Sequence, residues 1–115
     1  MIKTKNMESI FDTIKILSEL EDSNKDPSNY FIDFLHNDSF EAGILRLLPG
    51  QKDIQGPHSA DELYFVIEGN GFIRILQTDH AIKKGSCIFV PSNTKHHFHG
   101  NESDLVVLYV FNVSQ

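Results

Sequence analysis

The sequence predicts an all-β fold, a closed or sandwich-like barrel made by one small domain. Roughly eight to ten short apolar runs follow one another, separated by turn-forming residues and with almost no helical periodicity between them. The chain has 115 residues, of which 40% are hydrophobic and 10% aromatic. That composition supports one packed core and leaves little for a second.

Charge and cysteine content limit the classes of partner and location. The net charge is -6, and no Lys or Arg cluster is present to neutralise phosphates, so we expect no nucleic-acid partner. No apolar run approaches membrane-spanning length, so we expect no membrane association. The lone Cys87 cannot form an internal disulfide, and the N-terminus lacks an apolar signal core. A cytoplasmic location is therefore the expectation, with Cys87 buried in an apolar strand.

Residues 1–29 are expected to form an N-terminal segment ahead of a β-barrel domain at residues 30–115. From Ser9 to about Leu20, apolar residues recur at spacings of three and four, which predicts a short amphipathic helix with Ser9 as its candidate cap. The run at 14–17 fits an extended strand as well, and this alternative stays open. The polar stretch at 21–29 is interpreted as a loop.

The strands follow in order, each bounded by turn residues. Tyr30–Leu35 and Phe40–Leu48 are predicted strands joined by a turn-rich connector at 36–39, and a third strand begins near Glu62 and stops at the Gly69-Asn70-Gly71 turn. The remaining expected elements are a strand at 72–77, a turn at 78–80, short strands at 81–83 and 86–90, a turn at 91–94, a strand containing His96, a turn at 100–104, and an apolar strand at 105–113 buried on both faces.

Two stretches carry candidate chemistry. In the first, Pro57–Gly69, His58 stands four positions ahead of Glu62, which opens an alternating strand. The second, Gly85–His99, supplies His96 after a turn. Two imidazoles and a carboxylate are ligands that a divalent metal takes when strands bring them together. From the residues alone, solvent-exposed side chains without a metal are an equally open interpretation.

These stretches resemble the two motifs of the cupin family. Gly50, His58, Glu62 and Gly69 stand at the Gly, second His, Glu and closing Gly of the first motif, and Gly85, Pro91 and His96 fit the second. The chain departs from the pattern at three positions: Gly56 replaces the first His, Asn93 replaces a Gly, and Gly100 replaces the closing Asn. The departure at Gly56 removes one ligand, whereas Asn93 tolerates the positive φ that a Gly allows.

The resemblance implies a double-stranded β-helix, the cupin jelly-roll barrel, with a short N-terminal helix. It also implies a divalent metal ion, Fe, Mn, Ni or Zn, held by His58, Glu62 and His96. The expected function is binding of a small polar molecule, a sugar or a carboxylate, in the barrel, with a metal-dependent isomerase or oxygenase activity as one possibility. The alternatives are a non-catalytic ligand-binding or sensing module and a metal-free storage-like barrel, so whether the chain is an enzyme stays open.

Strand alternation predicts which side chains face the barrel interior. If Glu62 faces inward, so do Tyr64 and Val66, and if His96 faces inward, so does Phe98, with His97 and His99 pointing away. Tyr64 and Phe98 are therefore expected to line the cavity. The predicted core is the following set of apolar residues: Leu45, Leu47, Val66, Ile73, Ile75, Phe89, Val107 and Leu108.

The outward-facing row on the strand after Glu62 predicts a homodimer. Leu63, Phe65 and Ile67 are more apolar surface than so small a barrel can cover alone. Small cupins commonly dimerise, and the resemblance therefore points to the same association.

Further candidates for ligand binding are Arg46 and Tyr109. Arg46 is the lone charge of an apolar run, and it either faces outward or binds an anion inside the barrel. Tyr109 is either a core aromatic or a group at the site. For the ligand missing at Gly56 the nearest substitutes are Gln51, Asp53 and Gln55. Gln55 alternates away in a regular strand, so we expect water or substrate in that position.

Overall fold

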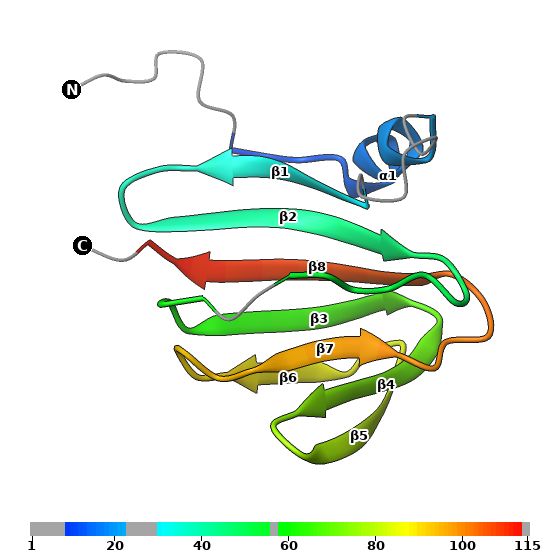
Figure 1. The fold of residues 1–115 in the computed structure, drawn as a ribbon. Coiled ribbons are helices and arrows are strands. Elements are labelled where there is room, and N and C mark those ends of the chain that lie inside the picture. Colours follow the sequence, from blue (N-terminus) through cyan, green and yellow to red (C-terminus); the bar gives the residue numbers. More distant parts are fainter. Residues whose placement is uncertain (1–8, 23–29, 56–57, 114–115) are drawn as a thin grey trace.

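The structure, a computed structural model, describes residues 9–22, 30–55 and 58–113. Within them it contains one helix, α1 (Thr13–Asp22), and eight strands (Figure 1). The strands are β1 (Phe31–His36), β2 (Phe40–Leu47), β3 (Glu62–Glu68), β4 (Asn70–Ile75), β5 (Thr78–Lys83), β6 (Cys87–Val90), β7 (His96–His99) and β8 (Leu105–Asn112). The predicted all-β fold class is confirmed. Gly56 and the predicted loop from residue 23 to residue 29 lie outside the described residues.

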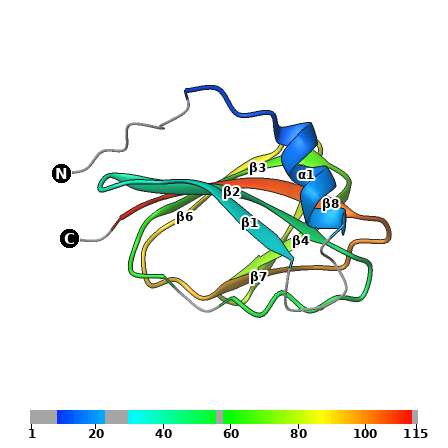
Figure 2. The same ribbon diagram turned by 90° about the horizontal axis from the view of Figure 1, so that it is seen from above.

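The strands form two antiparallel sheets. A five-stranded sheet has the order β1-β2-β8-β3-β6, and a three-stranded sheet has the order β5-β4-β7. Seen from above, the sheets are opposite walls of a flattened barrel, with α1 outside it (Figure 2). No helix of the described residues is long and apolar enough to span a membrane.

The register of the larger sheet determines which side chains meet inside the barrel. Tyr109 of β8 lies opposite both Gly43 of β2 and Tyr64 of β3. Two residues further along β8, Phe111 lies opposite Glu41 and Glu62. Because side chains alternate between the faces of a sheet, these two rows point to the same side. Residues far apart in the chain therefore share one inner surface.

The core fills the space between the sheets. Its fully buried members come from most strands: Tyr30, Leu45, Leu47, Tyr64, Val66, Ile73, Ile82, Val90, Phe98, Leu105, Val107 and Tyr109. Each fully buried aliphatic side chain of this kind stabilises the fold by about 1.5–3 kcal/mol. The predictions that Phe89 and Leu108 belong to the core are wrong, and Leu108 alternates with the core residues Val107 and Tyr109. Phe89 is 57% exposed because it pairs opposite Leu63, on the outer face. Cys87 lies two residues before Phe89 on the same strand, so its side chain is on the same face and is also exposed.

The N-terminal helix is confirmed, but its predicted cap is wrong. The Asp12 Oδ1 atom accepts hydrogen bonds from the backbone N–H groups of Ile14 and Lys15, both at 3.1 Å. An N-cap side chain satisfies the unpaired N–H groups of the first turn, and Ser9 lies too far ahead of that turn. The helix contacts β1 and β2 on their outer face, where Leu20 is buried.

The turn between β4 and β5 also differs from the prediction. Thr78 already pairs with Ile75, so the chain reverses at Leu76 and Gln77 and not at 78–80. Leu76 has a φ of 56°, in the left-handed region that two-residue hairpin turns require. The turn was missed because Leu is not a residue that signals such a conformation.

Gly43 is required by a close approach within the larger sheet. A Cβ atom at this position would overlap the Tyr109 hydroxyl and the backbone oxygen of Ile32. We therefore expect Gly43→Ala to lower the free energy of unfolding by about 1–3 kcal/mol, the usual cost of overpacking, as measured by urea denaturation. Gly71→Ala is the control, since its nearest contact would be 3.2 Å from the Asn101 Cβ. An equal loss in both variants would contradict the close approach.

Candidate functional site

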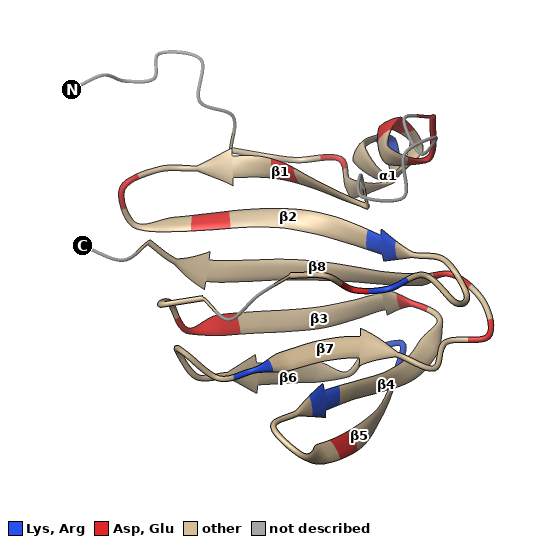
Figure 3. Cartoon of the chain, in the orientation of Figure 1, with Lys and Arg blue, Asp and Glu red and all other residues tan. Residues whose placement is uncertain are grey.

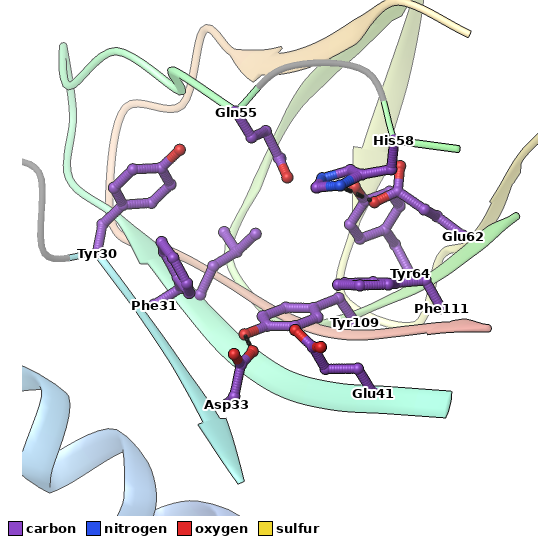
Figure 4. A pocket seen from close by; sticks show the side chains of 11 residues that line it. Tyr30, Phe31, Asp33, Glu41, Gln55, His58, Glu62, Tyr64, Tyr109 and Phe111 are labelled. Carbon is purple, nitrogen blue, oxygen red and sulfur yellow. Dashed lines mark hydrogen bonds and ion pairs between the residues drawn. The ribbon is translucent and has the colours of Figure 1, made fainter. Parts of the chain in front are cut away.

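A cavity of about 220 Å³ lies on the inner face of the larger sheet. Strands β1, β2, β3 and β8 contribute to its walls, together with Gln55 and His58 from the segment before β3 (Figure 4). Its lining residues are Tyr30, Phe31, Asp33, Glu41, Leu45, Gln55, His58, Glu62, Tyr64, Tyr109 and Phe111.

The three candidate metal ligands meet at the carboxylate of Glu62. The His96 Nε2 atom is 2.9 Å from Glu62 Oε1, and the His58 Nε2 atom is 3.5 Å from Glu62 Oε2. Glu62 is the first residue of β3 and His96 the first residue of β7, so two strand ends and the segment before β3 converge here. Glu62 is only 2% exposed, and its charge is poorly screened by water.

Two further contacts orient the His96 ring. Its Nδ1 atom is 2.8 Å from the carbonyl oxygen of Thr94. Because a carbonyl can only accept, Nδ1 carries the proton, and Nε2 faces Glu62 and the Tyr64 hydroxyl at 2.8 Å. A backbone acceptor on one ring nitrogen is the arrangement that prepares the other nitrogen for a metal.

The ionisation of this cluster follows from burial and from the charge of Glu62. Burial, followed by the negative charge of Glu62, raises the pKa of the Tyr64 hydroxyl far above its usual value, so the hydroxyl keeps its proton. Burial alone would lower the pKa of the His96 imidazole. The hydrogen bonds to Glu62 and the Thr94 carbonyl, with the charge of Glu62, outweigh it and raise this pKa.

The second oxygen of the Glu62 carboxylate has no hydrogen-bond partner, although it is buried. A buried acceptor without a partner costs about 1–3 kcal/mol, and a cation beside it would remove that cost. One carboxylate and two imidazoles are suitable donors for a divalent ion. In the described residues, however, no three His, Cys, Asp or Glu side chains are arranged around a common point.

Asp53 organises the segment that covers the cavity, a role that the sequence analysis missed. Its Oδ2 atom accepts hydrogen bonds from the Phe98 N–H at 2.9 Å and from Gln55 Nε2 at 3.0 Å. Its Oδ1 atom accepts one from the Tyr30 hydroxyl at 2.8 Å. With its amide nitrogen held in this way, Gln55 points its oxygen into the cavity (Figure 4). The prediction that Gln55 faces away is wrong, because this segment is not a regular strand.

The opposite end of the cavity is acidic and aromatic. The Tyr109 hydroxyl donates a hydrogen bond to Asp33, passing over Gly43. The Phe111 ring stacks between the rings of His58, at 5.1 Å, and Tyr109, at 5.7 Å. Glu41 lines the cavity beside them. A continuous wall of rings therefore joins the Glu62 end to the Asp33 and Glu41 end.

The four candidate ligand-binding residues lie in different places. Tyr64 and Tyr109 line the cavity. Phe98 is 1% exposed but lies behind the lining, packed edge-on against Tyr64 at 5.0 Å. Arg46 lies on the outer face, where its Nε atom is 3.0 Å from Asp104 Oδ2 and 3.8 Å from Glu21 Oε2.

The interpretation of Arg46 as an anion-binding group inside the barrel is therefore wrong. Its neighbours Leu45 and Leu47 face inward, and alternation turns Arg46 outward. His99 faces away from the cavity, as predicted, and its Nε2 atom is 2.9 Å from Asp79 Oδ1.

Several lining residues had no signal in the sequence. Phe31, Asp33, Glu41 and Phe111 belong to three different strands, and only the register of β1 with β2 and of β2 with β8 brings them together. Their alternation within each strand was visible, but which strands are neighbours was not. The acidic end of the cavity was therefore missed.

Comparison with known proteins gives one family. The family described as "Cupin domain" matches residues 43–111. An uncharacterized protein of Streptomyces coelicolor is 35% identical over 95 residues, which cover 83% of this chain and 90% of that protein.

Two solved structures share the fold. The plu4264 protein of Photorhabdus luminescens superposes with a TM-score of 0.64 at 28% identity, over 70% of this chain and 72% of that one. KdgF from Halomonas sp. superposes with a TM-score of 0.66 at 17% identity, over 74% and 78% of the two chains. At that identity the likeness to KdgF concerns the fold alone.

The raised pKa of His96 gives a prediction about pH. In an unfolded chain an imidazole titrates near 6.5. Because the folded value is higher, protonated His96 stabilises the fold fully below about pH 6.5, and this contribution is lost as the pH rises through the folded-state pKa. Titration of the metal-free protein followed by NMR at the His96 ring should give a midpoint above 6.5. Glu62→Gln should lower that midpoint, and a wild-type midpoint at or below 6.5 would contradict the contacts described.

Proposed function

The chain belongs to the cupin domain family, and on this basis we propose that its cavity binds a small polar molecule beside a divalent metal ion held by Glu62, His96 and His58. The observation that carries the proposal is the buried Glu62 Oε2 atom, which lacks a hydrogen-bond partner and lies 3.5 Å from His58 Nε2. The candidate ions are Fe, Mn, Ni and Zn, which all accept imidazole and carboxylate ligands. When bound, such an ion supplies Lewis acidity toward an oxygen of the ligand.

The residues around this centre bind and orient the ligand. The Tyr64 hydroxyl keeps its proton and lies 2.8 Å from His96 Nε2, so it becomes available to a ligand when that nitrogen binds an ion. The Gln55 oxygen points into the cavity and can accept a hydrogen bond from a ligand (Figure 4). His58 is part-exposed, and stacking on Phe111 holds its ring with Nε2 toward Glu62 at the cavity mouth.

These groups are compatible with a metal-dependent isomerase or oxygenase. One observation favours the alternative, a binding or sensing module without catalysis. The hydroxyls of Tyr30 and Tyr109 already donate to Asp53 and Asp33, so neither is available as an acid toward a ligand. The two functions differ in whether the ligand is turned over once it is bound.

The lining also bears on the expected ligand. A sugar or a carboxylate was anticipated, and the carboxylate depended on Arg46, which lies on the outer face. Among the described lining residues there is no Lys or Arg. A molecule rich in hydroxyl groups and without a negative charge therefore suits the walls better than a carboxylate does.

Metal binding should be visible as thermal stabilisation. An ion present at a hundred times its dissociation constant adds about 2.7 kcal/mol, which for a domain of this size raises the melting temperature by on the order of ten degrees. We expect such a shift with at least one of Mn, Fe, Ni and Zn in differential scanning fluorimetry. Glu62→Gln should abolish it, whereas Glu68→Gln, at the exposed end of β3, should retain it. Equal shifts in the two variants would place the ion elsewhere.

A homodimer through the outer face of the larger sheet is a second part of the proposal. Leu63, Phe65 and Phe89 are exposed there, and Leu63 and Phe89 are paired neighbours. Burying such a row in a symmetric contact is a common use of an exposed apolar face. The cytoplasmic location and the absence of nucleic-acid and membrane partners stay predictions from charge and cysteine content.

Light scattering at high micromolar concentration tests the dimer. We expect twice the chain mass for the wild type and the single-chain mass for Phe89→Glu, because a charge cannot be buried in an apolar contact without a partner. Leu76→Glu, at an exposed apolar position in the β4–β5 turn, is the control and should stay dimeric. A monomeric wild type would refute the proposal.

A further inference from the structure

We propose that the molecule bound in the cavity carries a cationic nitrogen, a protonated or quaternary amine, held at the end formed by Asp33, Glu41 and Tyr109. This inference rests on the proposed function, in that it assumes a small molecule binds in this cavity. It adds the chemical class of the ligand, which neither the family nor the fold specifies. Four observations carry it, and they concern charge, rings, an unpartnered atom and size.

The first observation is the charge of the lining. Its described residues include three carboxylates, Asp33, Glu41 and Glu62, and no Lys or Arg. Figure 3 shows acidic segments on β1, near the start of β2 and at the start of β3, whereas the basic segment of β2 lies near its other end. That basic segment is Arg46, which is on the outer face and is paired with Asp104. Asp33 and Glu41 at the far end therefore have no Lys or Arg of the described lining beside them, and their negative charge attracts cations.

The second observation is the wall of aromatic rings at the acidic end. Tyr109 and Phe111 stack at 5.7 Å and 18°, and Phe31 meets Tyr109 edge-on at 6.4 Å. In Figure 4 the carboxylates of Asp33 and Glu41 lie next to the Tyr109 ring, on the side of the cavity away from Gln55. Ring faces and carboxylates together are the environment in which an ammonium group binds, through cation–π attraction and charge.

The Tyr109 hydroxyl does not compete with this use of its ring. The hydroxyl donates its proton to Asp33, which fixes the ring across Gly43. Glu41 accepts a hydrogen bond from His36 Nδ1 at 2.7 Å, on the outer side of the cavity, and its own side chain is only 20% exposed. Its charge is therefore incompletely screened by water.

The third observation is independent of the acidic end. Glu62 Oε2 is buried, has no hydrogen-bond partner and faces the same cavity. A buried acceptor without a hydrogen-bond partner is a group that an ion or a ligand can satisfy. Glu62 can contact a metal ion or the ligand itself. In both cases, no Lys or Arg among the described lining residues neutralises Asp33 and Glu41.

The fourth observation is size. The cavity of about 220 Å³ is smaller than the 300–1,000 Å³ typical of sites for drug-sized ligands. It suits a metabolite-sized amine. A compact ammonium group with a short polar arm would place its cation at Tyr109 and its arm toward Glu62.

Matched probes separate charge from shape. Choline and 3,3-dimethylbutan-1-ol have the same outline, but only choline is a cation, and 3,3-dimethylbutanoate is a similar anion. Tetramethylammonium and ethanolamine extend the cation set. We expect NMR titrations of the wild type to give choline or another cation a dissociation constant at least about tenfold lower than that of the neutral isostere, with shifts at Tyr109 and Phe111. The anion should not bind at this end. If no cation binds more tightly than the neutral isostere, the proposal is wrong.

Variants test which residues cause the preference for a cation over the neutral isostere. Glu41→Gln and Asp33→Asn should each weaken cation binding several-fold and leave the affinity for the neutral isostere unchanged. Glu102→Gln changes the net charge by the same amount at an exposed position outside the cavity and is the control. Tyr109→Leu should remove the ring and abolish the preference for the cation, with its folded state checked by the NMR spectrum. A preference that survives in Glu41→Gln and Asp33→Asn as well as in Glu102→Gln would overturn the assignment.

Measurements on the same proteins test the ligand class and the metal site separately. The melting shift with Mn, Fe, Ni and Zn is measured on the wild type and on Glu62→Gln, and the cation titration is repeated with and without the ion. A normal metal shift with no cation preference overturns only the ligand class. A cation preference without any metal shift supports the ligand class and refutes the metal site.

Discussion

The buried carboxylate of Glu62 is the constraint on which the rest of the site depends. A carboxylate that is 2% exposed is stable only when its charge is compensated, and the penalty for leaving it unpaired is several kcal/mol. His96 supplies that compensation at 2.9 Å, and Thr94 holds the imidazole in the orientation that this contact needs. The second oxygen has no hydrogen-bond partner, and the His58 imidazole lies 3.5 Å from it. An ion or a ligand group placed beside this oxygen would supply the missing contact.

The walls around that carboxylate are rigid because regular strands build them. Tyr64 and Tyr109 are neighbours across β3 and β8, and Gly43 gives Tyr109 the room to reach Asp33 on β1. Asp53 holds the irregular segment before β3 in place. Its carboxylate accepts hydrogen bonds from Gln55, Tyr30 and the backbone N–H of Phe98. Sites carried on such a framework keep their geometry before a ligand arrives, which lowers the entropy lost on binding.

The cavity has two ends of different chemistry joined by one row of rings. At the Glu62 end are two imidazoles, an amide and a protonated phenol, a set suited to a metal ion and an oxygen-bearing group. At the other end are two carboxylates beside aromatic faces. The cupin scaffold by itself specifies neither end, since one fold serves many functions and only the residues of the site distinguish them.

The sequence by itself determined the fold class and the central trio. Alternation after Glu62, the turn residues between short apolar runs, and the spacing of His58, Glu62 and His96 are local patterns that can be read along the chain. Alternation also predicted that Tyr64 faces inward. Alternation alone could not decide whether Arg46 and Phe89 face inward or outward. Which of the two alternating sets of side chains faces the interior depends on what covers each face of the strand. Only the tertiary structure decided strand neighbours and register, and these bring Asp33, Glu41 and Phe111 to one cavity. It also placed Gln55 in the wall, because the hydrogen bond that turns its side chain inward comes from Asp53 in an irregular segment, where no period applies.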